Sequence, residues 1–155
     1  MKTRTSWREK LERVQESKVV AIPPKMQKRF GRGKMLIPRP LDVDALIRKV
    51  PRGKLVTQAQ LRETLVRACG ADIACPITTG IFVRIAAEAA CEDARAGKSR
   101  ITPYWRVIRD DGRLFEKLPG GPAAQADHLA AEGHALETAG KLRVKDPARS
   151  LVKLR

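Results

Sequence analysis

The chain has 155 residues, of which 43% are apolar and 32% are charged, and its formal net charge is +15. This length fits one domain, and because only 4% of the residues are aromatic, its core must be mainly aliphatic. The longest apolar runs are far too short to span a bilayer, so the composition argues against a membrane-spanning protein.

The positive charge is concentrated at the two ends of the sequence. Residues 1–40 hold 12 Lys and Arg against 3 Asp and Glu, and residues 141–155 hold 6 against 1, whereas residues 41–140 hold 14 against 13. We therefore expect a basic N-terminal helix and extended arm, a folded domain and a basic C-terminal tail over these three ranges. Basic segments attract polyanions by releasing counterions, which favours nucleic acid as the partner. A solubilising charge excess, or attraction to an anionic membrane surface, would explain the same distribution.

Cysteine and histidine bear on compartment and cofactors. An odd, small number of cysteines without a signal peptide favours the reducing cytoplasm. The cysteines lack the paired spacing of a metal site, and the histidines lie in a different segment. We expect no metal, no cofactor and a monomer. The residues concerned are Cys69, Cys75, Cys91, His128 and His134.

One helix and one strand are predicted in the first forty residues. Ser6 can cap a short helix that runs to about Ser17. Pro23-Pro24 is expected to end regular structure, and residues 25–40 to form an extended arm with a short strand at 34–37. The apolar residues of this arm would also let it pack on the domain.

Two further helices are predicted between residues 41 and 70. The first starts after Leu41, with Asp42 or Asp44 as its cap. The second starts at Thr57, which forms a capping box with Gln60, and it ends near Gly70.

A longer helix is predicted after a connector over residues 71–77. It runs from a cap at Thr78 or Thr79 to about Ala96, with Arg84 and Ala87 on the face opposite its apolar stripe. Two capped helices joined by a connector form a helix-turn-helix candidate. Beyond it we expect turns at 110–112 and 119–122, a last helix over 123–136, and a tail that is disordered or forms a strand at 141–144. The predicted fold class is mostly α with short strands, of the winged-helix or helix-turn-helix type.

Several short motifs follow one another in the order known from one protein family. They are VPRGKLVT at 50–57, Gln60-Leu61, PYWRVI at 103–108, DGRL at 111–114, Gly120-Gly121, Leu129 and EGH at 132–134. Together they resemble the C-terminal, DNA-binding and active-site domain of the O6-alkylguanine-DNA alkyltransferases over roughly residues 42–136. We expect no counterpart of the family's separate N-terminal domain in this sequence, where the first forty residues stand before the matched region.

The resemblance implies that the family's chemistry is lost. Tyr104 stands where the family keeps the cysteine that accepts the alkyl group, Trp105 stands where it keeps the histidine base, and Glu132 matches the glutamate that orients that base. An ordinary phenol is only about 0.1% ionised at pH 7, and an indole N–H can only donate. We therefore expect no catalytic residues, as in alkyltransferase-like relatives that lack the acceptor cysteine.

The resemblance also implies a nucleic-acid-binding surface. Gln58 replaces a family tyrosine, and Arg84 is the candidate for the arginine that the family inserts into the duplex, with a solvated arginine as the alternative. Tyr104 either stacks on a flipped base or only fills the old pocket. The expected binding residues are Thr57, Gln58, Thr79, Arg84, Ala87, Tyr104, Arg106 and Arg113.

These features predict a non-catalytic protein that binds double-stranded DNA and recognises O6-alkylguanine or another damaged base for repair. One alternative is a repurposed module that binds RNA or a ribonucleoprotein. Another is an alkyltransferase that uses Tyr104 or Cys75 as acceptor, since a thiol near a helix N-terminus can have a lowered pKa.

Overall fold

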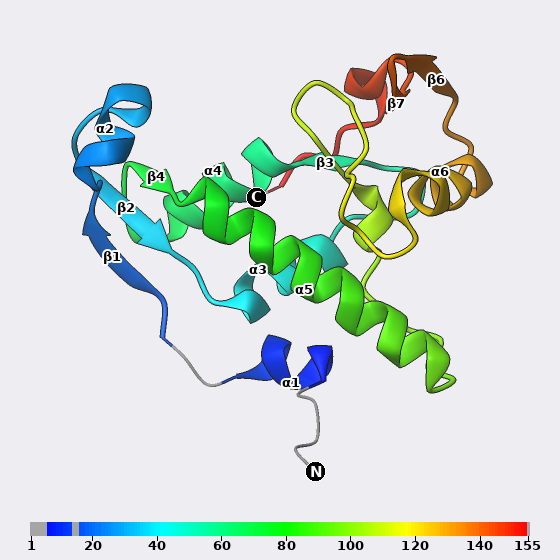
Figure 1. Ribbon diagram of the computed structural model, residues 1–155, viewed down its shortest axis with the longest axis horizontal. Helices are drawn as coiled ribbons and strands as arrows, with labels where there is room; N and C mark the ends of the chain where they lie inside the picture. The colour runs from blue at the N-terminus through cyan, green and yellow to red at the C-terminus, as the bar shows by residue number, and fades with distance from the viewer. Residues whose placement is uncertain (1–5, 14–15, 155) are drawn as a thin grey trace.

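The protein is described by a computed structural model that covers residues 6–13 and 16–154 (Figure 1). The helices are α1 (Trp7–Glu12), α2 (Pro24–Phe30), α3 (Pro40–Arg48), α4 (Gln58–Cys69), α5 (Pro76–Arg95) and α6 (Gly121–Ala131), with 3₁₀ turns η1 (Tyr104–Arg106) and η2 (Pro147–Ser150). The strands are β1 (Lys18–Ala21), β2 (Lys34–Ile37), β3 (Val56–Thr57), β4 (Ile73–Ala74), β5 (Val107–Ile108), β6 (Leu136–Ala139) and β7 (Lys141–Val144). The predicted class, mostly α with short strands, is confirmed.

The main core lies between α1, α3, α4 and α5. Aliphatic side chains of these helices pack together, and the closely packed alanines of α5 let neighbouring elements approach its backbone. Figure 1 shows α5 crossing the molecule between α2 with β1 and β2 at one end and α6 with β6 and β7 at the other. The largest fully buried side chains of this core are Leu11, Val43, Ile47, Val50, Val56, Leu61 and Val83.

Residues 18–37 form a β1–α2–β2 unit. Strand β1 pairs antiparallel with β2, and β2 pairs parallel with β4, the strand directly before α5. The predicted strand at 34–37 is confirmed, but the expectation of an extended arm over 25–40 is wrong. Pro24 occupies the first turn of α2, where its missing N–H costs no hydrogen bond, so the proline pair starts a helix.

The helix starts agree only in part with the sequence signals. Ser6 caps α1 as predicted, but α1 ends at Glu12. Helix α3 begins at Pro40, before the expected start, so Asp42 lies inside its first turn and accepts the Arg39 N–H at 3.2 Å. Asp44 is buried and does not cap the helix.

The bounds predicted for the helix after Thr57 are confirmed, whereas the next helix begins earlier than predicted. Thr57 and Gln60 form the capping box of α4, and Gly70 ends it in the left-handed conformation that glycine tolerates. Helix α5 starts at Pro76 with Cys75 as its cap, so Thr78 and Thr79 lie inside it.

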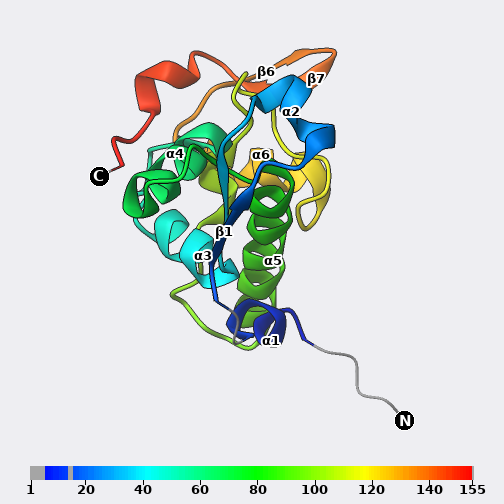
Figure 2. The ribbon, with the colours of Figure 1, turned by 90° about the vertical axis from the view of Figure 1, so that its left-hand side faces the viewer.

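The C-terminal part closes the domain rather than trailing from it. Strands β3 and β5 pair in parallel, and Leu55 beside them bridges to Leu151. The predicted strand at 141–144 is confirmed as β7, which forms a hairpin with β6, while α6 is shorter than the predicted 123–136. Figure 2 shows this hairpin above α6. In the part of the chain that the structure describes, no helix has the length and apolar character needed to cross a membrane.

Candidate nucleic-acid interface

Tyr104 is packed inside the protein. It lies on η1, is only 3% exposed, and its ring meets Trp105 and His128 edge-on at centroid distances of 5.3 and 6.0 Å. Its hydroxyl accepts a weak hydrogen bond from Cys91 Sγ at 3.6 Å. Burial, together with this contact, raises the pKa of Tyr104 well above its ordinary value. The aromatic side chain therefore fills the position that the resemblance assigns to the alkyl acceptor.

Trp105 connects this closed site to Glu132. Its indole Nε1–H donates to Glu132 Oε2 at 2.7 Å, and the exposed His128 ring stacks on it at 4.2 Å with an interplanar angle of 13°. The indole thus supplies the donor that an imidazole would supply to this carboxylate, but it has no lone pair with which to act as a base.

Glu132 and Arg106 form a buried ion pair that joins three segments. Arg106 Nη2 lies 2.9 Å from Glu132, and its Nη1 donates to the Val50 carbonyl at 2.7 Å. Glu132 also accepts the Gly53 N–H at 3.1 Å. Burial alone would raise the pKa of Glu132, but hydrogen bonds from Arg106, Trp105 and Gly53 outweigh it and lower that pKa. The Arg106 side chain is consequently used to hold the fold together, and only 13% of it is exposed. This contradicts the prediction that Arg106 is a binding residue.

Three other predicted binding residues also face inward. Thr79 and Ala87 are fully buried, and Thr57 is buried with its hydroxyl accepting the Gln60 N–H at 3.1 Å. The prediction that they contact nucleic acid is therefore wrong for this structure. Helix α5 packs against α1, α3, α4 and η1, so more than one of its faces is buried.

An open groove of about 410 Å³ lies where the start of α4, the first half of α5 and the loop over 109–118 meet. Gln58 lines it from α4, and Arg84 lines it from α5. Arg109 and Lys117 line it from the loop together with Glu116, so three basic side chains stand against one acidic side chain. Gln58 and Arg84 were predicted as binding residues, whereas Arg109 and Lys117 were not. Neither Arg109 nor Lys117 belongs to a recognised motif, and only the fold shows that they lie on this groove.

The α5 side of this groove carries two exposed isoleucines. Ile77 and Ile81 are 64% and 53% exposed, and they lie one helical turn apart. Gly80 between them allows close packing, because a Cβ there would approach the Gln58 amide to 3.3 Å. The Arg84 guanidinium, one turn from Ile81, lies 5.7 Å from the centre of the Trp7 ring of α1.

A second hollow of about 340 Å³ continues the groove toward α2. It shares Gln58, Pro76 and Arg109 with the first and adds Arg113, a predicted binding residue. Arg113 is paired with Asp111 at 2.6 Å.

Cys75 is buried beneath the start of α5. Its Sγ accepts hydrogen bonds from the Thr78 N–H and hydroxyl at 3.5 and 3.2 Å, so its contacts are those of a helix cap. Among the described residues, no cluster of three His, Cys, Asp or Glu side chains is arranged to hold a metal ion.

Comparison with known proteins gives matches in structure alone. No family model matches the sequence, and no curated protein matches it. The structure of S. pombe Atl1 in complex with damaged DNA containing O6-carboxymethylguanine aligns with a TM-score of 0.50 at 19% identity, covering 74% of this chain and 94% of that one. A structure of S. pombe ATL in complex with DNA aligns with a TM-score of 0.52 at 18% identity and the same coverage. The chain therefore has the fold of the alkyltransferase-like proteins, as the order of its motifs predicts.

Proposed function

We propose that this protein binds double-stranded DNA without catalysing a reaction on it, through the groove between α4, α5 and the 109–118 loop. The observation that carries the proposal is the composition of the groove. Exposed Ile77 and Ile81 stand beside Arg84, Arg109 and Lys117, and among the described residues none of these three cations forms an ion pair.

This composition suits the minor groove of a duplex. The cations neutralise phosphates, and apolar side chains on a helix enter between base steps and bend the duplex. In this proposal α4 and α5 are the two helices of a helix-turn-helix, and the start of α5 approaches the bases. The shared fold with two proteins solved in complex with DNA supports the same reading.

The site around Tyr104 supports a role without alkyl transfer. The phenol is buried and its pKa is raised, so its nucleophilic phenolate form is negligible at neutral pH. Trp105 cannot take its proton. Cys75 is buried in a capping role and lies outside the residues that line the groove.

We infer that a damaged base, when extruded, enters the groove beside Phe115 and Leu118 rather than the space filled by Tyr104. The volume of about 410 Å³ is within the range of small-molecule pockets, and Phe115 offers an aromatic surface for stacking. Recognition of O6-alkylguanine at this place is the finer part of the proposal.

Binding of fluorescein-labelled duplexes, followed by anisotropy, tests both parts. We expect the wild type to bind duplex DNA, and Arg84→Gln with Arg109→Gln to weaken binding at least tenfold, by about 1.4 kcal/mol or more. Arg95→Gln with Arg100→Gln removes the same charge at the far end of α5 and is the matched control. Equal losses in the two pairs, or stronger binding to duplex RNA, would contradict the proposal.

The lesion is tested by comparing duplexes with and without O6-methylguanine. We expect tighter binding to the modified duplex and a smaller difference for Phe115→Ala. Equal affinities for the two duplexes would remove damage recognition but leave general DNA binding intact. Intact-mass measurement after incubation should show no alkyl group on the protein.

A further inference from the structure

The β1–α2–β2 unit, residues 18–37, carries a dense positive charge. It contains six Lys and Arg and no Asp or Glu, and all six side chains are exposed. None of them forms an ion pair with another described residue. The six residues are Lys18, Lys25, Lys28, Arg29, Arg32 and Lys34.

The unit is attached to the start of α5. The Cys75 N–H donates to the Leu36 carbonyl at 2.9 Å, and the Asp72 N–H donates to the Lys34 carbonyl at 2.9 Å. Asp72 Oδ2 in turn accepts the Lys34 N–H at 2.8 Å. Gly33, at φ +146, is needed here because a side chain would collide with the Asp72 carboxylate.

A small apolar cluster holds α2 on this sheet. Ile22, Met35 and Cys75 are buried together, and Met26 of α2 packs against them. The Gln27 side-chain amide also donates to the Ile22 carbonyl at 3.1 Å. The basic residues of α2 therefore belong to a fixed element and not to a loose arm. Figure 2 shows the backbone of α2 at the upper end of β1.

The end of α2 lies on the second hollow, which continues the groove of the proposed DNA interface. Arg29 and Phe30 line the second hollow, and this hollow shares Gln58, Pro76 and Arg109 with the groove beside α5. The acidic side chains of this hollow are already neutralised, since Asp110 is 3.6 Å from Arg62 and Asp111 is 2.6 Å from Arg113. The groove and the second hollow together therefore keep an excess of positive charge from α5 to α2.

We propose that the β1–α2–β2 unit is a second phosphate-binding arm, which grips the backbone of double-stranded DNA beyond the part held by α5. Lys28 and Arg29, in the last turn of α2, make two of its phosphate contacts. Lys25 and Arg32 lie near them along the same stretch and extend the contact. The inference rests on the proposed DNA binding, and it adds an element that lies outside the family-like motifs.

The number of phosphate contacts is measured by the salt dependence of binding. Each contact contributes about −0.9 to the slope of log K against log salt, so Lys28→Gln with Arg29→Gln should reduce its magnitude by about 2. The wild type's advantage over this variant should then shrink about tenfold between 50 and 200 mM salt. Lys25→Gln with Arg32→Gln is a second pair, expected to reduce the slope as well.

Arg95→Gln with Arg100→Gln is again the matched control, and its slope should equal that of the wild type. If the Lys28 and Arg29 pair also keeps the wild-type slope while the wild type binds DNA, the arm is disproved and the proposed function stands. If the wild type does not bind duplex DNA, both proposals fail. A slope that changes for duplex RNA and not for DNA would overturn the choice of partner.

Discussion

Tyr104 is a buried aromatic side chain at the position that the family resemblance assigns to the alkyl acceptor. Its ring occupies the interior between Trp105, His128 and Cys91, so its contribution is expected in stability and not in DNA contact. Tyr104→Ala should lower the free energy of unfolding by about 3–5 kcal/mol through the cavity that it leaves.

Tyr104→Phe keeps the ring and removes only a hydroxyl that accepts one weak bond. We expect it to cost less than about 1 kcal/mol and to leave DNA affinity unchanged, as measured by urea unfolding and anisotropy. A Phe variant that is equally stable but binds DNA ten times more weakly would show that the hydroxyl touches the nucleic acid.

Glu132 predicts a dependence of stability on acid pH. Its pKa is lowered in the folded protein from an ordinary value of 4.5, so the unfolded state binds more protons as the pH falls. Its stabilising contribution is complete above that value and is lost as the pH drops through the lower folded value. Glu132→Gln should therefore flatten the acid side of the stability curve.

Urea unfolding at a series of pH values below 6 would measure this flattening. At neutral pH the same variant should cost about 1–3 kcal/mol, because Arg106 and Trp105 lose a charged acceptor. Glu137→Gln, on an exposed carboxylate paired with Arg143, is the control and should keep the wild-type curve shape. Identical curves for all three proteins would refute the role given to Glu132.

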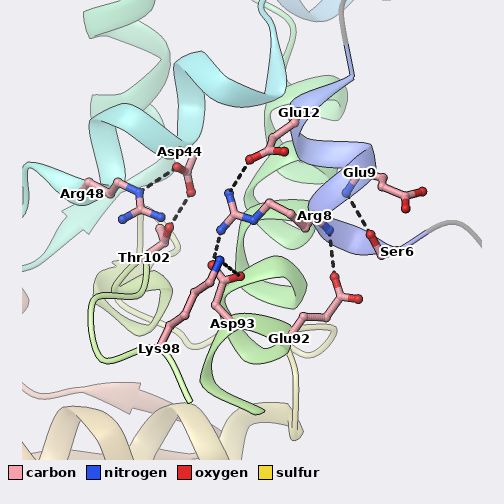
Figure 3. Close-up of polar contacts among 10 residues, drawn as sticks. All are labelled: Ser6, Arg8, Glu9, Glu12, Asp44, Arg48, Glu92, Asp93, Lys98 and Thr102. Carbon is pink, nitrogen blue, oxygen red and sulfur yellow. Dashed lines mark hydrogen bonds and ion pairs between the residues drawn. The ribbon is translucent and has the colours of Figure 1, made fainter. Parts of the chain in front are cut away.

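At the scale of elements, a polar cluster fastens α1 to α5 (Figure 3). The Arg8 guanidinium pairs with Asp93, whose side chain is 7% exposed, and the Arg8 N–H donates to Glu92 at 2.8 Å. Burial opposes the charge of Asp93, but Arg8 and Lys98 outweigh it and lower its pKa. Arg8→Met should cost about 3 kcal/mol, because it leaves a buried carboxylate with only Lys98, 3.5 Å away.

Arg48, which Figure 3 also labels, offers a matched comparison through the variant Arg48→Met. Arg48 pairs with buried Asp44 at 2.9 Å, but Asp44 keeps the hydrogen bond from the Thr102 hydroxyl at 2.6 Å. We expect a smaller loss than for Arg8→Met. Adding Asp93→Asn to Arg8→Met should restore part of the stability, which a double-mutant cycle would measure as coupling. Strict additivity would contradict a direct interaction.

The elements also show which sequence signals suffice. Caps act within a few residues, so the Thr57–Gln60 box, the Ser6 cap and the Gly70 stop could be predicted. Helix α2 could not, because Pro23-Pro24 is compatible with either stopping or starting a helix. The buried faces of α5 depend on elements outside the helix, namely α1, α3, α4 and η1, so the burial of Ala87 could not be predicted from the helical pattern alone.

The residues of the candidate site also fall into those that the sequence predicts and those that only the structure shows. Motif order identified the fold. Gln58 lies between two matched segments and Arg84 on the helix predicted after them, and the structure places both on the groove. The commitment of Arg106 to Glu132 is not visible in a list of motifs. Lys117 joins the groove only because the 109–118 loop folds back beside α5.

At the scale of the whole molecule, the three ranges suggested by charge are joined by side-chain packing and strand pairing. Leu11 is fully buried in the main core, β2 pairs with β4, and Val144 is buried near the other end. We expect a chain that starts at Lys18 to lose about 5 kcal/mol, from the burial of Leu11 and the pairing of Asp93. This is a large part of the stability of an ordinary domain.

Urea unfolding of the shortened chain beside full-length Leu11→Ala separates the two contributions. The point variant should lose about 2–5 kcal/mol and the shortened chain more. A shortened chain with the wild-type midpoint would mean that α1 is an independent appendage, as the charge distribution alone suggests.

The Gln60 side chain, which closes the capping box of α4, has a consequence for how the protein folds. Its Nε2 donates to the Val152 carbonyl at 2.7 Å, a partner 92 residues further along the chain. Such non-local contacts raise the contact order and slow folding, because chain entropy is lost before the contact forms. During synthesis, this end of α4 must wait for the segment around Val152 to emerge. Leu36 and Val56, both on β-strands, belong to the core cluster against which Val152 packs, so they are then exposed for longer to association with other chains.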